Sequence, residues 1–151
     1  MKLIIQRVAT ASVSVDGVVI GQIGKGFLVL LGIHKDDKPE QTTWLVKKLA
    51  ALRVFEDEAG KMNLGLNDIG GEVLVISQFT LYGNCLNGRR PDFFSAAPGS
   101  QAEPIYNKFV EELKGEIVNV QTGKFAAHMV VSLVNDGPVT LIIDDDERMK
   151  S

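Results

Sequence analysis

A chain of 151 residues, 45% hydrophobic and 23% charged, has the size and composition of one globular domain, so we take residues 1–151 as a single domain. Its formal net charge of −3 disfavours a protein that binds long stretches of nucleic acid backbone, because such binding needs Lys and Arg to neutralise phosphates. The single cysteine excludes an intrachain disulfide, and two distant histidines disfavour a metal site, so we expect neither a metal nor a cofactor. No stretch has the apolar length of a membrane span, and Gln6 and Arg7 interrupt the first apolar run too soon for a signal peptide. We therefore expect a cytoplasmic protein without membrane contact.

The first quarter of the chain is predicted to form β-strands. Asp16-Gly17 lies between two β-rich runs and is a strong hairpin turn signal. Residues 27–33 are almost continuously apolar, which is typical of a strand covered on both faces. The short β-rich runs before it span residues 3–8, 12–15 and 18–23.

Two helices are predicted to pack on this sheet. Asp37 followed by Glu40 has the spacing of a capping box, and Ser100 followed by Glu103 forms a second one. Apolar residues recur at helical spacing after each box, which gives each helix one face for packing. These residues are Trp44, Leu45, Leu49 and Leu52 in the first helix and Ala102, Ile105, Tyr106, Phe109, Val110 and Leu113 in the second.

The remaining strands do not alternate regularly with helices. They are expected at residues 72–81, 117–121 and 130–143. This order favours an α+β fold with a compact, largely antiparallel sheet and two flanking helices. Between the strand expected at residues 72–81 and the second helix, residues 82–99 are rich in Gly, Asn, Arg and Pro and have the length of a functional loop. The acidic stretch that begins at Asp144 is expected to be a solvated tail, residues 144–151.

Polar groups gather at the end of the predicted strand 72–81. In an extended segment, Gln78 and Thr80 point to one side and Ser77 and Phe79 to the other, so Gln78 and Thr80 could meet a ligand together. Alternatively, the hydroxyl groups satisfy local backbone groups at a strand end. As a nucleophile, Thr80 lacks an activating base in its neighbourhood, and the chain has no Gly-x-Ser-x-Gly motif.

A proline interrupts the last apolar run. Pro138 has no N–H, so the hydrogen-bond ladder of a strand over residues 130–143 has to break or turn there. Glycine before proline places its carbonyl in directions closed to other residues, so the carbonyls of Gly137 and Pro138 could point together into a cavity. A plain trans turn at a strand end is the alternative.

Two stretches resemble the paired signature motifs of the D-aminoacyl-tRNA deacylases. They are residues 77–81, Ser-Gln-Phe-Thr-Leu, and residues 135–140, Asn-Asp-Gly-Pro-Val-Thr. The resemblance runs the length of the chain, with further matching stretches at residues 5–8, 61–64, 88–91 and 122–125. The chain departs from the family's pattern at residues 84–87 and at Asp92, which affects a loop and leaves the two signature motifs intact.

The resemblance implies a compact β-barrel-like fold and a homodimer with active sites at the subunit interface. It also implies that the Gly137-Pro138 peptide bond is cis and reaches into the pocket beside residues 77–80 of the partner subunit. Two fixed backbone carbonyls there would leave no room for an L side chain, whereas a D side chain would point outward. The implied activity is hydrolysis of the ester of D-aminoacyl-tRNA to free D-amino acid and tRNA, a step of translation quality control.

The same resemblance implies how the reaction proceeds and which other substrates it accepts. Because glycine has no side chain to exclude, we expect mischarged glycyl-tRNA(Ala) to be hydrolysed and many D residues to be accepted. The 2′-hydroxyl of the terminal adenosine would assist the reaction, while Gln78, Phe79 and Thr80 would supply positioning and oxyanion contacts. The implied partner is the 3′ end of aminoacyl-tRNA, which needs few phosphate contacts and so suits an acidic protein.

Six residues are expected to bind this substrate: Ser77, Gly137, Pro138, Phe125, Met129 and Arg7. Phe125 and Met129 resemble the family's apolar wall for the terminal adenine, with simple core packing as the alternative. Arg7 would hold the Gly137-Pro138 segment by a hydrogen bond to a carbonyl, or would be an exposed strand arginine.

Two other functional classes compete with this interpretation. An RNA-binding module without turnover would need a broader basic or aromatic surface than a chain with 7% aromatic residues offers. A small-molecule esterase or amidase that uses Thr80 would act without RNA.

Overall fold

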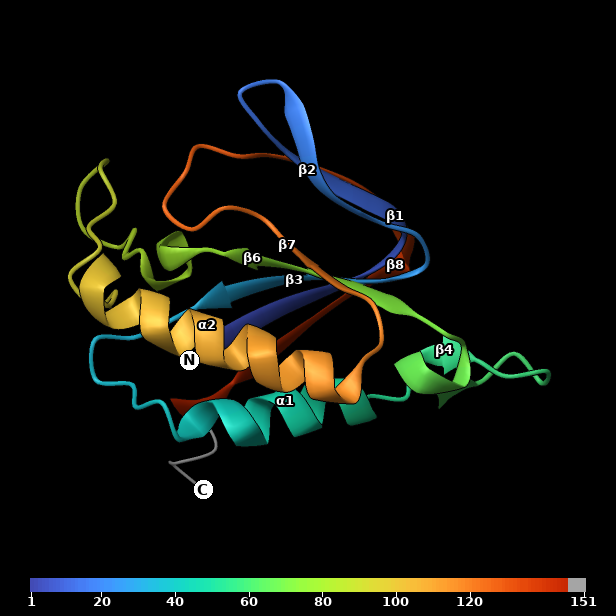
Figure 1. Cartoon of the computed structure of the whole chain (residues 1–151). Helices are drawn as coiled ribbons and strands as arrows, with labels where there is room; N and C mark the ends of the chain where they lie inside the picture. The colour runs from blue at the N-terminus through green and yellow to red at the C-terminus, as the bar shows by residue number, and fades with distance from the viewer. Residues whose placement is uncertain (147–151) are drawn as a thin grey trace.

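The computed structural model describes residues 1–146 (Figure 1). A long irregular segment precedes the second α-helix. In chain order the elements are β1 (Lys2–Val15), β2 (Val18–Ile23), β3 (Gly26–Gly32), α1 (Gln41–Ala51), β4 (Phe55–Glu56), β5 (Met62–Leu64), the 3₁₀ helix η1 (Leu66–Asp68), β6 (Glu72–Ser77), the 3₁₀ helix η2 (Phe79–Tyr82), α2 (Gly99–Glu116), β7 (Val120–Thr122) and β8 (Val130–Asp144).

One six-stranded sheet is organised around β1 (Figure 1). β1 pairs antiparallel with β3 and then β2 along one edge, and with β8 along the other. β6 adds parallel to β3, and β7 adds parallel to β6. The two ends of this order also meet, because a Cβ atom added to Gly21 of β2 would lie 2.8 Å from the Thr122 carbonyl oxygen of β7. The sheet is therefore mixed, mostly antiparallel and nearly closed, which confirms the predicted α+β fold with a barrel-like sheet.

Two sequence signals of the first quarter are confirmed by the local structure. Asp16 and Gly17 both have positive φ, 51° and 78°, as the two-residue type I′ turn between paired strands requires. β3 is buried on both faces, with Phe27 in the core beneath the helices and Leu28 in a second core inside the curled sheet. The two expected runs at the start of the chain form one continuous strand, because β8 pairs with both halves of β1.

The two helices close the larger core against the sheet (Figure 1). Both predicted capping boxes are wrong: α1 begins at Gln41, α2 begins at Gly99, and neither has a side-chain cap hydrogen bond. The Asp37 carboxylate instead accepts a hydrogen bond from the N–H of His34, at 2.6 Å, in the turn before α1. Among residues 1–146, no helix is long and apolar enough to cross a membrane.

β8 carries the interruption that was predicted at Pro138. Its pairing with β1 omits residues 136–139, which bulge out opposite Arg7. The side-chain amide of Asn135 donates to the carbonyls of Arg7 and Val139, at 3.0 Å each, and so closes the bulge. β8 is thus a single strand with a bulge at the predicted interruption.

The predicted solvated tail is wrong for the part of it that the structure describes. Asp144 ends β8, and Asp145 is fully buried. The α-ammonium of Met1 lies 2.5 Å from Oδ1 of Asp145 and 2.8 Å from Oδ2 of Asp37. A sequence pattern gives no sign of this ion pair, because its two partners are 144 positions apart. Residues 147–151 of the expected tail lie outside the described residues.

We expect Asp145→Asn to lower the free energy of unfolding by about 3 kcal/mol, because it removes a buried charge partner of the Met1 ammonium. Urea unfolding followed by circular dichroism measures the change. Asp144→Asn is the matched control: its carboxylate lies 3.7 Å from Lys2 Nζ in a partly exposed pair, whose loss should cost at most about 1 kcal/mol. Equally small losses in both variants would show that the buried pair contributes little.

Candidate functional site

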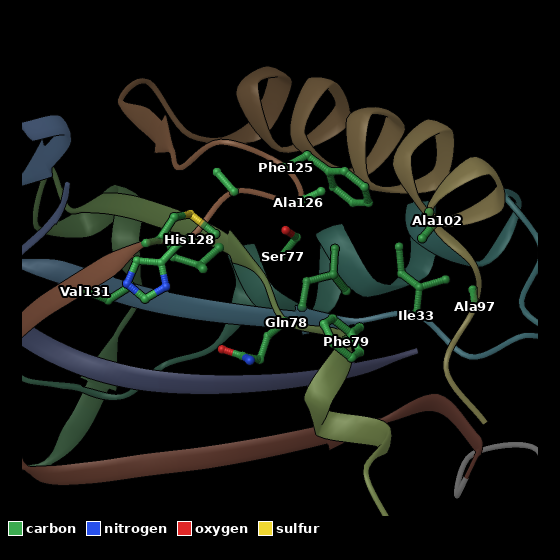
Figure 2. Close-up of a pocket in the computed structure, with 15 residues that line it drawn as sticks. Ile33, Ser77, Gln78, Phe79, Ala97, Ala102, Phe125, Ala126, His128 and Val131 are labelled. Atoms are coloured by element: carbon green, nitrogen blue, oxygen red, sulfur yellow. The ribbon is translucent and has the colours of Figure 1, made fainter. Parts of the chain in front are cut away.

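A cavity of about 520 Å³ lies at the edge of the sheet where three neighbouring strands end (Figure 2). β3, β6 and β7 are parallel to one another, so their carboxyl ends reach this edge together. In parallel sheets this is the edge at which ligands usually bind. The cavity is lined from the ends of β3 and β6, the start of α2 and the segment between β7 and β8.

Five of the residues predicted for the site meet in this cavity (Figure 2). They are Ser77, Gln78, Phe79, Phe125 and Met129. In Figure 2, Phe125 and Phe79 approach from opposite sides with Ser77 between them. Segments about 50 positions apart in the sequence are joined here because β6 and β7 are neighbours in the sheet.

The polar end of β6 does not remain extended as predicted. Gln78 continues the ladder, with its N–H 2.8 Å from the Leu31 carbonyl oxygen, and the chain then turns into η2. Thr80 is consequently exposed and outside the cavity lining, and its hydroxyl accepts a hydrogen bond from the Gln78 side-chain amide. The N–H groups of Phe79 and Thr80, at the start of η2, donate to no acceptor within the described residues.

The segment between β7 and β8 forms the facing wall. Phe125 packs against Tyr106 of α2, with ring centroids 5.7 Å apart. Burial raises the pKa of Tyr106 to about 12, so its hydroxyl stays protonated at neutral pH and donates to the Val75 carbonyl at 3.2 Å. Met129 lies so close to Gly123 that a Cβ atom there would have no room. Phe125 and Met129 both line the cavity and pack against the apolar cores, so the two alternatives do not exclude each other.

The cavity offers little side-chain chemistry. Among its lining residues, only Ser77, Gln78 and His128 carry polar side chains, and only His128 is titratable. His128 is exposed, and within residues 1–146 no hydrogen bond joins Ser77 or Thr80 to a histidine or a carboxylate. A hydroxyl nucleophile needs such a base beside it. His128 was not predicted for the site, because no partner residue lies near it in the sequence at a recognisable spacing.

Besides Thr80, three predicted site residues lie outside the cavity of their own chain: Arg7, Gly137 and Pro138. Arg7 is only 4% exposed, and its Nε donates to the Asp136 carbonyl at 2.9 Å, so it is not an exposed strand arginine. Gly137 has a φ of 148°, and a Cβ atom there would lie 2.5 Å from the backbone nitrogen of Val139. The Gly137-Pro138 peptide bond is cis, and both residues are exposed.

The guanidinium of Arg7 also connects the bulge of β8 to β4. Its Nη1 lies 2.7 Å from the Val54 carbonyl oxygen and 3.0 Å from Oε1 of Glu56. The hydrogen bond from Arg7 holds the pKa of Glu56 below its ordinary value of 4.5. One buried cation thus fixes the position of the 136–139 bulge relative to the body of the sheet.

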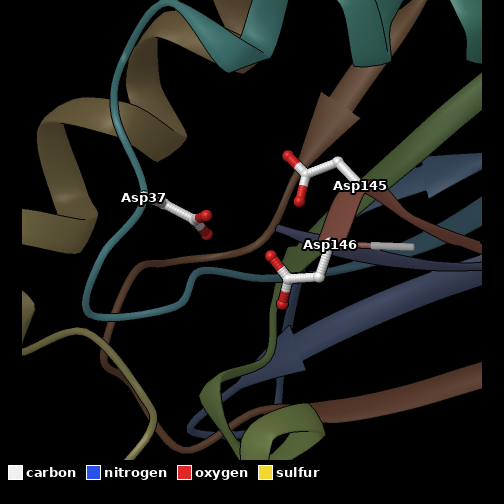
Figure 3. A group of neighbouring side chains, drawn as sticks. All are labelled: Asp37, Asp145 and Asp146. Carbon is white, nitrogen blue, oxygen red and sulfur yellow. The ribbon is translucent and has the colours of Figure 1, made fainter. Parts of the chain in front are cut away.

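One group of carboxylates in the described part of the chain has the spacing of a metal site: Asp37, Asp145 and Asp146 (Figure 3). Asp37 and Asp145 already contact the α-ammonium of Met1. Since this ammonium supplies the positive charge that a metal ion would bring, we assign the group to the stability of the fold.

Comparisons with known proteins point to one family. The family model described as D-Tyr-tRNA(Tyr) deacylase matches residues 4–144. The chain is similar to the D-aminoacyl-tRNA deacylase of Clostridium novyi (strain NT), with 58% identity over 98% of this chain and 99% of the relative. It is also similar to that of Protochlamydia amoebophila (strain UWE25), with 54% identity over 100% of both chains.

Two solved structures resemble the fold closely. The c-Myc DNA Unwinding Element Binding Protein has a TM-score of 0.90 and 45% identity, covering 95% of this chain and 98% of that chain. A probable eukaryotic D-amino acid tRNA deacylase has a TM-score of 0.83 over the same shares of the two chains. At 16% identity, this second likeness shows the fold alone.

Arg7→Met should raise the pKa of Glu56 toward 4.5, because the variant removes the hydrogen bond that favours the carboxylate. A depressed folded-state pKa stabilises the fold above the unfolded pKa, and this contribution is lost as the pH falls through the folded pKa. The variant should therefore lose the part of the acid-induced decrease in stability that comes from Glu56. An NMR pH titration of Glu56 measures the shift, with Arg53→Met as control, because Arg53 hydrogen-bonds Asn63 instead. An unchanged Glu56 pKa in Arg7→Met would contradict this account.

Proposed function

The chain belongs to the D-Tyr-tRNA(Tyr) deacylase family, and we propose that its cavity holds the esterified 3′ end of a D-aminoacyl-tRNA. The protein is a D-aminoacyl-tRNA deacylase, a hydrolase of ester bonds. The observation that carries the proposal is the mostly apolar cavity of about 520 Å³ with Ser77, Gln78 and Phe79 on one side. This volume is in the range of small-ligand sites and suits a nucleoside with an attached amino acid. Because aminoacyl-tRNA is a substrate of translation, we place the reaction in the cytoplasm.

The terminal adenine is assigned to the wall between β7 and β8. Phe125 offers a ring on which a base stacks, and Met129 offers a flexible thioether that adapts to the shape of the base. Both side chains are partly buried and line the cavity, which supports this assignment. The amino acid then lies toward the Gln78 and Phe79 end of the cavity.

The second half of the site is assigned to a second copy of the chain. Gly137 and Pro138 are exposed and lie outside the cavity of their own subunit. They belong to β8, which among the described strands pairs only with β1 and so has a free edge. Val130, Val134 and Ile142 of β8 are also exposed apolar residues. Proteins normally cover a long apolar edge strand, and a homodimer would do so while bringing the 136–139 bulge to the cavity of the partner subunit.

Selection for the D residue would then come from the main chain. Two carbonyls, those of Gly137 and Pro138, would occupy the space into which an L side chain projects, whereas a D side chain would point outward. Overlap with rigid backbone costs at least about 1–3 kcal/mol. Since about 1.4 kcal/mol corresponds to a tenfold difference, the same overlap gives roughly five- to 100-fold selectivity or more. The hydrogen bonds from Arg7 and Asn135 support this role because they hold the bulge in place.

The protein would act by positioning, with the 2′-hydroxyl of the terminal adenosine assisting the hydrolysis. The lack of a nucleophile with an adjacent base among the described lining residues supports this mechanism. The free N–H groups of Phe79 and Thr80 are suitable donors for the oxyanion that forms on the ester carbonyl. The hydrogen bond between Gln78 and Thr80 would keep the Gln78 amide oriented toward the substrate.

The two competing functional classes, a nucleic-acid-binding module and a small-molecule esterase, account for fewer of these observations. The name of one similar structure refers to DNA binding by that protein. In this chain, a net charge of −3 and 7% aromatic residues do not provide a broad surface for nucleic acid. An esterase that uses Thr80 as its nucleophile is disfavoured, because Thr80 lies outside the cavity lining and its hydroxyl pairs with an amide.

The purified protein should hydrolyse D-tyrosyl-tRNA and glycyl-tRNA(Ala) and leave L-tyrosyl-tRNA intact, because only the L side chain would meet the two carbonyls. We expect a difference of at least about fivefold between the D and L esters, the lower end of the overlap cost, and about 100-fold or more at its upper end. The rates of loss of the three labelled esters, corrected for spontaneous hydrolysis, measure it. Equal hydrolysis of all three esters would mean that the bulge does not face the amino acid.

Dilution tests the cross-subunit part of the same prediction. If each site needs two chains, the activity per chain should fall in step with the dimer fraction measured by mass photometry. A monomer with full activity and full selectivity would remove the cross-subunit assignment and leave the deacylase activity in place.

Thr80→Ala and His128→Gln should each keep activity within about tenfold of the original protein, because neither side chain serves as nucleophile or base in this mechanism. A positioned acid or base contributes roughly 10²–10⁴-fold, so the two cases are well separated. Single-turnover rates on D-tyrosyl-tRNA at saturating protein measure the effect. A loss of more than about 10²-fold in one variant would make that side chain a chemical participant.

A further inference from the structure

A loop of residues 83–96 projects from the fold between η2 and α2 (Figure 1). Its two sides are joined at the base, because the N–H of Asn84 donates to the Asp92 carbonyl at 2.8 Å and the N–H of Asp92 donates back at 3.1 Å. Closer to α2, His34 and Ala96 form a second bridge. These two sets of contacts hold the loop in place. The residues between Asn84 and Asp92 form its protruding tip.

Side-chain packing connects the 83–96 loop to the cavity. Phe93 meets Phe79 edge-on, with ring centroids 5.2 Å apart, and Phe79 lines the cavity. The Phe93 ring also lies close to Gly83, where a Cβ atom would be 2.9 Å from it. The position of the loop is thus set by contacts with the same residue that borders the substrate.

The 83–96 loop exposes large apolar side chains, which folded proteins usually bury. Leu86 is 92% exposed, and Phe94, at the foot of the tip, is 82% exposed. Arg89 and Arg90 are exposed as well, and neither forms an ion pair or a hydrogen bond within residues 1–146. Unpaired guanidinium groups and an exposed ring on one loop are the side chains that bind single-stranded nucleic acid, with phosphates on the cations and bases on the ring.

We propose that the 83–96 loop binds the substrate RNA beyond its terminal adenosine, with Arg89 and Arg90 on phosphates and Phe94 stacked on an unpaired base. The proposal rests on the proposed function, which places the terminal adenosine in the cavity beside Phe79. Charge complementarity selects RNA over a protein as the occupant, because two uncompensated cations stand together on a chain whose net charge is −3. The loop would extend the contact with RNA from the cavity outward.

The test compares four full-length proteins: the original chain, the double variant Arg89→Gln with Arg90→Gln, the variant Phe94→Ala, and Lys61→Gln. Lys61 is an exposed cation in the turn between β4 and β5, at the opposite end of the molecule in Figure 1, and serves as the matched control. The probe is a fluorescein-labelled RNA hairpin of an acceptor stem with an unpaired CCA 3′ end. Fluorescence anisotropy gives its Kd over a range of salt concentrations.

The double variant should bind the hairpin about tenfold more weakly at physiological salt, and its plot of log affinity against log salt should be shallower by about 1 to 2. Phe94→Ala should lose about tenfold in affinity with no change in that slope, because it removes stacking and no charge. Lys61→Gln should match the original chain. As a second readout, D-tyrosyl-adenosine, which lacks the rest of the RNA, should be hydrolysed equally by all four proteins.

Hairpin affinities and salt slopes that stay unchanged in both loop variants would overturn the proposal and leave deacylation in the cavity untouched. A loop variant that keeps its RNA affinity but changes its mass in solution would assign the tip to contact between copies of the chain, which also overturns it. If the original protein hydrolyses neither D-tyrosyl-tRNA nor D-tyrosyl-adenosine, the proposed function fails, and the hairpin affinities still decide whether the loop binds RNA.

Discussion

The N–H and C=O groups along a long, largely buried strand all need partners, and β1 meets this demand along both edges over 14 residues. β3 and β2 share one edge, and β8 follows the other. The exception lies opposite Arg7, where β8 leaves the ladder and the side chains of Arg7 and Asn135 supply the missing hydrogen bonds. The sheet can therefore expose Gly137 and Pro138 at a defined position without losing its continuity.

Local patterns predicted the parts of the fold that depend on residues close in sequence. The apolar run at 27–33 became β3, and Asp16-Gly17 became the hairpin turn. The capping box at Asp37 failed because that carboxylate pairs with the Met1 ammonium and a backbone N–H in the preceding turn. Asp145 was misjudged for the same reason: its partner is close in space and distant in sequence.

For the candidate site, too, the sequence predicted what depends on neighbouring residues and missed what depends on residues distant in the chain. Signature motifs located residues 77–80 and 135–140, and the structure places Ser77, Gln78 and Phe79 of the first motif in a cavity with Phe125 and Met129. That convergence depends on the parallel pairing of β3, β6 and β7, which the periodicity of one sequence does not specify. Thr80 was placed on the wrong surface because η2 ends the alternation of an extended strand. His128 lines the cavity together with Phe125 and Met129 of the same segment, but the sequence shows no partner residue for it at a recognisable spacing.

The free N–H groups of Phe79 and Thr80 at the start of η2 also bear on how this protein tolerates mutation. A main-chain N–H persists whichever side chain the residue carries, and only proline removes it. A phenylalanine codon needs two base changes to become a proline codon and a threonine codon needs one, so Thr80→Pro is the one single-base substitution that removes either N–H. On the proposed mechanism, very few mutations can therefore remove the N–H groups that contact the oxyanion. Most harmful mutations would instead disturb the packing that orients these groups toward the ester.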